Sequence, residues 1–167
     1  MYKKILVAVD NSDTGKLALK EAVKIAKELG SKLRIVYVID SFNVYPAAEY
    51  VSYEDLKESM EQEGKLILDA AKASLKSSAI SFSQHLLKTT TKKPRIAEAI
   101  AADAEKWGAD LIVVGTHGRR GFSHFLLGSV AESIIRAATK PILLIRGGVD
   151  LSGFIGPISS RNSGSRY

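Results

Sequence analysis

Short runs of apolar residues alternate along the 167-residue chain with segments whose apolar residues recur every three or four positions. The short runs predict strands at 5–9, 33–39, 80–87, 111–114 and 141–145. The periodic segments predict helices at 14–29, 52–77, 94–107 and 129–138. Alternation of this kind predicts an α/β fold, a doubly wound five-stranded parallel sheet with helices on both faces.

The composition of each run indicates its place in the sheet. The runs 5–9 and 111–114 are apolar at consecutive positions, as strands covered on both faces must be, so we expect them at the centre. The run 80–87 alternates apolar and polar residues and leads into Lys88, which favours an edge strand. Residues 40–51 have no clear period and are predicted to form a loop.

Capping residues mark the predicted helix ends. Ser52 and Asp55 have the capping-box spacing, and Pro94 suits the first turn of its helix. Gly30 and Gly108 follow the last periodic residues of two helices and are expected to end them.

The charge of the chain is distributed unevenly. The net charge is +6, and residues 72–95 hold six lysines and arginines with no acidic residue. One interpretation is a solvated helix end followed by a lysine-protected edge strand. The alternative is an interaction module whose basic edge, Lys72 to Arg95, docks an acidic partner or nucleic acid, although the segment lacks a recognition motif.

Composition also limits the chemistry and the location. The absence of cysteine excludes a thiolate zinc site, an iron–sulfur cluster and thiol redox chemistry. No stretch approaches the roughly 18 apolar residues that span a membrane, so we expect a soluble, cytoplasmic protein. Residues 1–146 are predicted to form one domain, and the Gly- and Ser-rich residues 147–167 a flexible tail.

Two segments compete for the place where a doubly wound sheet binds ligands, beyond the carboxyl ends of its central strands. Residues 10–15 follow the first strand and residues 115–121 follow the fourth. If both strands are central, they are neighbours and these loops line one crevice.

The second segment has glycines that suit a phosphate site. Gly115 and Gly118 allow the backbone to approach a ligand, while Gly128 and Ser129 open a helix whose free amides favour an anion. The chain has neither a Walker-type Gly-Lys-Ser/Thr sequence nor the dinucleotide G-x-G-x-x-G fingerprint, so hydride transfer is not predicted.

Gly115-x2-Gly118-x9-Gly128-Ser129 resembles the G-x2-G-x9-G-[S/T] signature of the ATP-binding universal stress proteins, and Val9-Asp10-x-Ser12 adds to the resemblance, which spans roughly residues 2–146. The resemblance implies an adenine-nucleotide alpha-hydrolase-like fold with strand order 3-2-1-4-5. It also implies a homodimer paired through the last strand, Pro141 to Ile145.

The resemblance further implies an ATP site, with a divalent metal such as Mg or Mn on the phosphate oxygens. Residues on the adenine and ribose side would be Ala8, Asp10, Val38, Val114 and Gly115. Residues holding the phosphates would be Gly118, Gly128, Ser129 and Val130. Ala8 and Lys92 stand where relatives often have proline and glycine, respectively.

The function expected from the resemblance is an ATP-binding sensor or regulator of the stress response with at most slow hydrolysis. One alternative is a slow ATPase or nucleotidyl-transfer enzyme that uses Asp10 or His117. Simpler roles also stay open, because Asp10 could form only a turn and Ser129 could form a capping box with Glu132.

Overall fold

The computed structural model describes residues 1–40, 52–76, 78–89, 95–116 and 127–147. Within these residues the chain forms five strands and four helices. The strands are β1 (Lys4–Ala8), β2 (Lys32–Asp40), β3 (Phe82–Thr89), β4 (Leu111–Gly115) and β5 (Ile142–Ile145). The helices are α1 (Asp13–Leu29), α2 (Tyr53–Ser74), α3 (Ile96–Trp107) and α4 (Ser129–Ala137).

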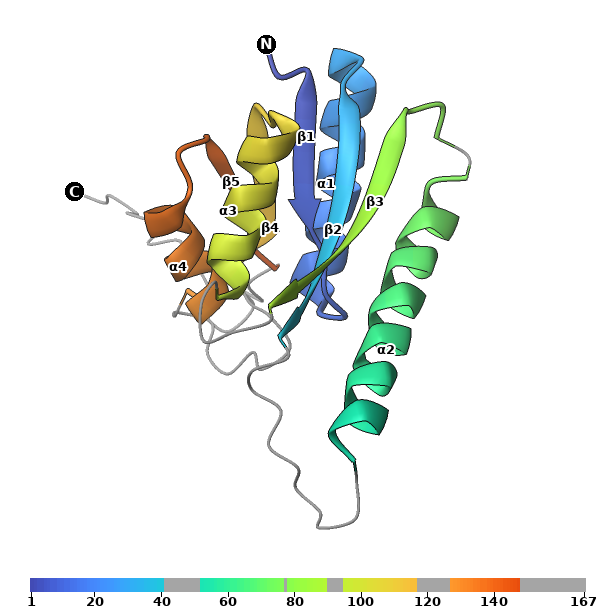
Figure 1. The fold of residues 1–167 in the computed structure, drawn as a ribbon. Coiled ribbons are helices and arrows are strands. Elements are labelled where there is room, and N and C mark those ends of the chain that lie inside the picture. Colours follow the sequence, from blue (N-terminus) through green and yellow to red (C-terminus); the bar gives the residue numbers. More distant parts are fainter. Residues whose placement is uncertain (41–51, 77, 90–94, 117–126, 148–167) are drawn as a thin grey trace, which may run out of the picture.

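All five strands run parallel in the order β3-β2-β1-β4-β5 (Figure 1). β1 is central, because Ile5 pairs with Leu33 of β2 on one side and with Leu111 of β4 on the other. The chain runs from β1 outwards through β2 to β3. It then returns to the other side of β1, where it adds β4 and, at the opposite edge, β5. The predicted doubly wound sheet is therefore confirmed, with β3 at an edge as its alternating pattern indicated.

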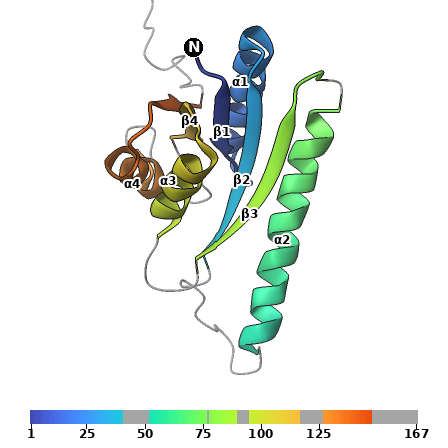
Figure 2. The same ribbon diagram turned by 45° about the horizontal axis from the view of Figure 1, so that its top comes forward.

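Helices lie on both faces of the sheet (Figures 1 and 2), and each face carries its own apolar core. Ile5 and Val7 of β1 point into a core with α1 and α2, whereas Leu6 points into a second core with α3 and α4. All three side chains are fully buried, since each strand at the centre is covered on both faces.

Ser52, Gly30 and Gly108 are confirmed as helix-capping residues. Ser52 accepts a hydrogen bond from the Asp55 amide at 3.1 Å, as an N-cap does. Gly30 and Gly108 follow α1 and α3 with φ values of 64° and 72°, a left-handed conformation that glycine adopts without strain.

The predicted ends of β3, the end of α2 and the start of α3 differ from the structure by two or three residues. β3 spans residues 82–89 rather than 80–87, because β2 extends through Asp40 and pairs there with Thr89. α2 ends at Ser74 rather than residue 77. α3 begins at Ile96, with the Glu98 carboxylate accepting from the Arg95 amide at 2.6 Å, while Pro94 lies outside the described residues.

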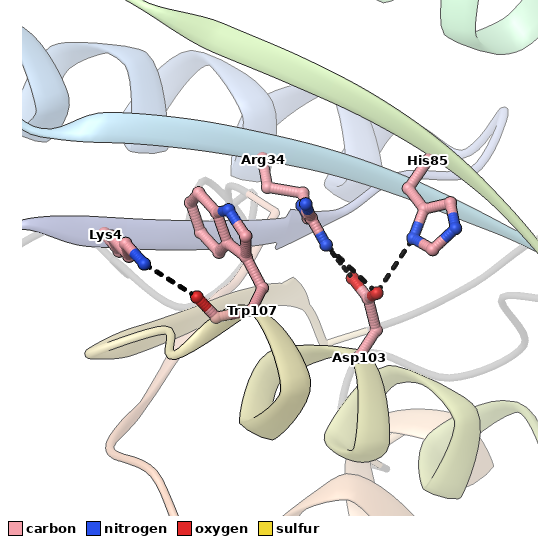
Figure 3. Close-up of polar contacts among 5 residues, drawn as sticks. All are labelled: Lys4, Arg34, His85, Asp103 and Trp107. Carbon is pink, nitrogen blue, oxygen red and sulfur yellow. Dashed lines mark hydrogen bonds and ion pairs between the residues drawn. The ribbon is translucent and has the colours of Figure 1, made fainter.

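A polar network ties α3 to the sheet (Figure 3). Asp103 of α3 is only 5% exposed, and its carboxylate contacts Arg34 of β2 at 3.1 Å and Nδ1 of His85 of β3 at 2.8 Å. The Arg34 guanidinium also lies 4.7 Å from the centre of the Trp107 ring, and Lys4 donates to the Trp107 carbonyl at 2.8 Å. Trp107 thus anchors the end of α3 to the sheet.

Replacement of the central carboxylate tests this network. We expect Asp103→Ala to lower the free energy of unfolding by about 3 kcal/mol, because it leaves the partly buried Arg34 without its anion. Lys106→Ala, at an exposed position of the same helix, is the control and should change it by less than about 1 kcal/mol. Chemical denaturation measures both, and equal values for the two variants would contradict the assigned role.

Candidate functional site

The carboxyl ends of β1 and β4 lie side by side, because the two strands are parallel neighbours. The segment after β1 touches the end of β4. A Cβ atom at Gly115 would lie 2.8 Å from both the backbone carbon and the hydroxyl oxygen of Thr14. The segment 10–15 and the start of the second expected loop, Gly115, therefore meet at this edge of the sheet.

The turn after β1 is organised around Asp10. Its Oδ1 accepts hydrogen bonds from the Ser12 amide at 3.1 Å and the Ser12 hydroxyl at 2.5 Å. The Ser12 hydroxyl in turn accepts from the Gly15 amide at 3.0 Å and caps α1. The simpler interpretation of Asp10 as a turn-forming residue is thus confirmed, and its role towards a ligand stays a prediction.

Thr14 and Gly15 lie in the predicted segment 10–15, but the sequence interpretation gave them no role of their own. A Cβ atom at Gly15 would lie 2.2 Å from the Asp10 carboxylate oxygen, so only glycine fits while this turn keeps its shape. Glycine in the first turn of a helix is unfavourable for the helix itself, which is the signal that could have indicated a packing role.

The structure changes the interpretation of Gly115. Its lack of a side chain was expected to admit a ligand, but the space that a Cβ would fill is taken by Thr14 of the same chain. Gly115 therefore permits the close contact between β4 and α1. Any role beside the ribose would be played by its backbone.

The N-terminus of α4 is held against β4. The Gly128 amide donates to the Thr116 carbonyl at 2.7 Å, and the Gly128 carbonyl accepts the first hydrogen bond of the helix from Glu132 at 2.9 Å. Ser129 and Val130 are exposed. The amides of residues 129–131 precede the first intrahelical donor, so they have no acceptor within α4 and mark the positive end of its dipole.

The proposed capping box of Ser129 and Glu132 is wrong. The N-cap is Gly128, so Ser129 is already the first helical residue, one position too late to cap. The Glu132 carboxylate instead pairs with Arg136 one turn further on, at 2.5 Å. Ser129 is therefore not used as a cap.

Ala8, Val38 and Val114 lie at the carboxyl ends of β1, β2 and β4 and belong to the layer of the sheet that faces α3 and α4. Ala8 and Val38 are partly exposed, whereas Val114 is 4% exposed. The first two can therefore offer side-chain surface to a ligand on the same side of the sheet as α4.

A sequence model of the Universal stress protein family matches residues 1–146. The chain belongs to the universal stress protein family. Its strand order is that of the adenine-nucleotide alpha-hydrolase-like fold, as the resemblance implied.

Individual relatives agree with this assignment. The chain is 34% identical over 146 residues to Universal stress protein MJ0531 of Methanocaldococcus jannaschii, covering 87% of this chain and 83% of that one. A universal stress protein family structure from Burkholderia pseudomallei is 32% identical, with a TM-score of 0.69 and coverage of 86% and 96%. A universal stress protein from Archaeoglobus fulgidus, solved in complex with dAMP, is 27% identical, with a TM-score of 0.60 and coverage of 86% and 98%.

Several predicted residues of this universal stress protein lie outside the described residues. These are Gly118, His117 and Lys92. Over the described ranges, no group of three or more His, Cys, Asp or Glu side chains could hold a metal ion.

The described part of the basic segment 72–95 agrees with its interpretation as a solvated helix end followed by an edge strand that carries lysine. Lys88 of β3 pairs with Glu61 of α2 at 2.6 Å, and this contact holds the pKa of the Glu61 carboxyl below its ordinary value. Lys72 and Lys76 are exposed on α2 and just after it. None of the helices that the structure describes is long and apolar enough to cross a membrane.

The contact between β4 and α1 can be tested with two glycines that face the same threonine. We expect Gly115→Ala to destabilise the fold by about 1–3 kcal/mol, because its Cβ would lie within 2.9 Å of three Thr14 atoms. Gly147→Ala is the matched control, since its Cβ would lie 3.4 Å from Thr14 Cγ2, an ordinary contact. Thermal and denaturant unfolding of both variants measure the difference, and an unchanged stability of Gly115→Ala would refute the close approach.

Proposed function

We propose that this chain is a cytoplasmic, ATP-binding universal stress protein that acts as a sensor or regulator of the stress response. ATP binds in the crevice between residues 10–15 and the N-terminus of α4. The observation that carries the proposal is the hydrogen bond from Gly128 to Thr116, which holds the open end of α4 beside the carboxyl ends of β1 and β4.

The phosphates bind at the α4 end of the crevice. The amides of residues 129–131 have no acceptor within the helix, and the helix dipole favours negative charge there. Both Ser129 and Val130 are exposed, so a phosphate can reach these amides without displacing a side chain from the core. The Ser129 hydroxyl adds a further donor, and Gly118 completes the family motif.

The nucleoside binds at the β1 end. The amide and the hydroxyl of Ser12 donate to Oδ1 of Asp10, and Oδ2 accepts from a ribose hydroxyl. Ala8 and Val38 supply partly exposed apolar surface at neighbouring strand ends for the adenine ring. The relative from Archaeoglobus fulgidus in complex with dAMP supports a nucleoside monophosphate unit as the common element of such ligands.

Hydrolysis is at most slow. Efficient phosphoryl transfer needs a positioned nucleophilic water and concentrated charge around the phosphates. The Asp10 carboxylate, one of the two residues considered as a base, is held by the Ser12 hydroxyl at 2.5 Å and serves the turn. The crevice is therefore better suited to binding ATP, with Mg or Mn on its phosphate oxygens, than to turning it over.

Ser129 permits a direct test of the phosphate contact. Proline is tolerated at the first position of a helix and lacks the amide hydrogen, and the Gly128 ψ of 148° is compatible with a following proline. We expect Ser129→Pro to weaken Mg-ATP binding about tenfold, measured by calorimetry, since the amide contact contributes on the order of 1.4 kcal/mol.

Two controls make this result specific. Ser129→Ala keeps the amide and should retain most of the affinity, and the affinity for adenosine should be equal in all three proteins because adenosine has no phosphate. Mg-ATP binding that is unchanged in folded Ser129→Pro, or absent from the parent protein, would contradict the proposed site.

The resemblance also implied pairing through the last strand, and we infer that two copies join along β5. The Pro141 carbonyl accepts from the Ile112 amide of β4, and the Ile145 carbonyl from Thr116 just after β4. By the period of two, the backbone groups of Ile142 and Leu144 face away from β4. All four residues of β5 are partly exposed and apolar, although the strand lies at the edge of the sheet. An exposed apolar edge strand presents backbone N–H and C=O groups that can pair with the same strand of a second copy.

Proline at an outward-facing position tests the pairing. Leu144→Pro removes an amide that faces away from β4, so we expect a folded monomer where the parent is a dimer. Light scattering coupled to gel filtration gives the mass of each, and circular dichroism checks the fold. A parent protein that is monomeric at all concentrations would rule out the inferred dimer.

A further inference from the structure

A groove separates α1 from α2 on the face of the sheet away from α3 and α4. It has a volume of about 720 Å³, and eight of its fifteen lining residues are apolar. Along α1 it extends from Gly15 to Val23 and along α2 from Glu63 to Leu75, about 12 and 18 Å at the rise of an α-helix. The groove is thus elongated, and its volume lies within the range of small-molecule sites.

The groove exists because α2 is fixed over β2 and β3, towards one edge of the face that also carries α1. A Cβ atom at Gly64 would lie 2.7 Å from the Leu86 side chain and 3.0 Å from the Tyr37 ring, so glycine lets α2 settle onto β2 and β3. Lys88 of β3 binds Glu61 at 2.6 Å, and the Gln84 side chain donates to the Leu68 carbonyl. Figures 1 and 2 accordingly show α2 alongside β3 and set away from α1.

The floor of the groove is apolar, and part of its rim is apolar as well. Val9, Leu19 and Ile67 belong to the core beneath it or pack against that core. Leu66 also lines the groove, and 70% of its surface is exposed, which is a large exposed fraction for a leucine.

Charges at the rim on the α1 side favour an anion. Lys16 and Lys20, one turn apart, both line the groove and are exposed. Within the described ranges no carboxylate lies within salt-bridge distance of Lys20, while Lys16 makes only an exposed 3.7 Å pair with Asp13. The two carboxylates of the lining are already engaged, Asp10 by Ser12 and Glu63 by another partner.

We propose that this groove binds a single-chain amphipathic carboxylate of the fatty-acid class. The alkyl chain lies between α1 and α2 on the apolar floor, and the carboxylate faces Lys16 and Lys20. An elongated apolar groove with two exposed lysines on one rim matches a molecule that is apolar along its length and anionic at one end. The site lies on the face of the sheet away from α4, meets the proposed nucleotide crevice only in the segment 10–15, and does not rest on the proposed nucleotide binding.

Calorimetric titration of the nucleotide-free protein with dodecanoate, below its micelle concentration, tests the proposal. We expect saturable binding of one molecule per chain. Dodecyltrimethylammonium, with the same chain and a cationic head, should bind at least about tenfold more weakly. No binding of dodecanoate, or equal binding of the two amphiphiles, would overturn the proposal.

Two substitutions at exposed positions locate the site with matched controls. Ala70→Trp fills the groove and should weaken dodecanoate binding about tenfold, whereas Asp69→Trp places the same indole on a side of α2 that does not line the groove. Lys20→Glu should weaken binding by about five- to tenfold, whereas Lys106→Glu makes the same charge change on α3, across the sheet.

Each outcome of these comparisons is decisive. Losses confined to Ala70→Trp and Lys20→Glu, with circular dichroism unchanged, support the groove as the site. Equally weakened dodecanoate binding in the controls Asp69→Trp and Lys106→Glu would show that dodecanoate binds elsewhere or acts as a detergent. That result would overturn the proposal.

Discussion

The close approach of β4 to the first turn of α1 is the constraint on which the rest of the structure depends. Gly115 leaves no room for a Cβ against Thr14, so the end of β4 and the turn after β1 form one continuous edge. Thr116, the next residue, then accepts the Gly128 amide and places the start of α4 at that edge. A parallel sheet brings the carboxyl ends of its central strands together, and these contacts convert that edge into a crevice with a positive helix end.

The two faces of the sheet are built differently. On one face, the buried Asp103 carboxylate draws Arg34 and His85 towards α3 and closes the layer over β2 and β3. On the other, Gly64 seats α2 over the same two strands, and a groove lies between α1 and α2 with Val9, just after β1, in its lining. Asp10 lies where this groove meets the turn after β1, so the two proposed sites share one boundary.

The fold was predictable because its signals are local. Consecutive apolar residues marked β1 and β4 as central, and an alternating run marked β3 as an edge strand. The Asp103–Arg34 pair was not predictable, since its partners are 69 residues apart and neither lies in a local motif. The Ser129–Glu132 spacing fits a helix that begins after Ser129, and only the Gly128 backbone shows that α4 begins earlier. The place of Gly115 in the site was foreseen, but the atoms that demand glycine there belong to Thr14, a tertiary contact.

The most direct test of the account is to map Mg-ATP binding by amide chemical shifts of the isotopically labelled protein. The account predicts saturable shifts concentrated in residues 8–15, 114–116 and 128–131, with the amides of Ser129 and Val130 among the largest. Residues lining the groove on α2, such as Ala70 and Ser74, should be unaffected. Shifts confined to α2, or none at any ATP concentration in the folded protein, would contradict the placement of a nucleotide at the α4 crevice.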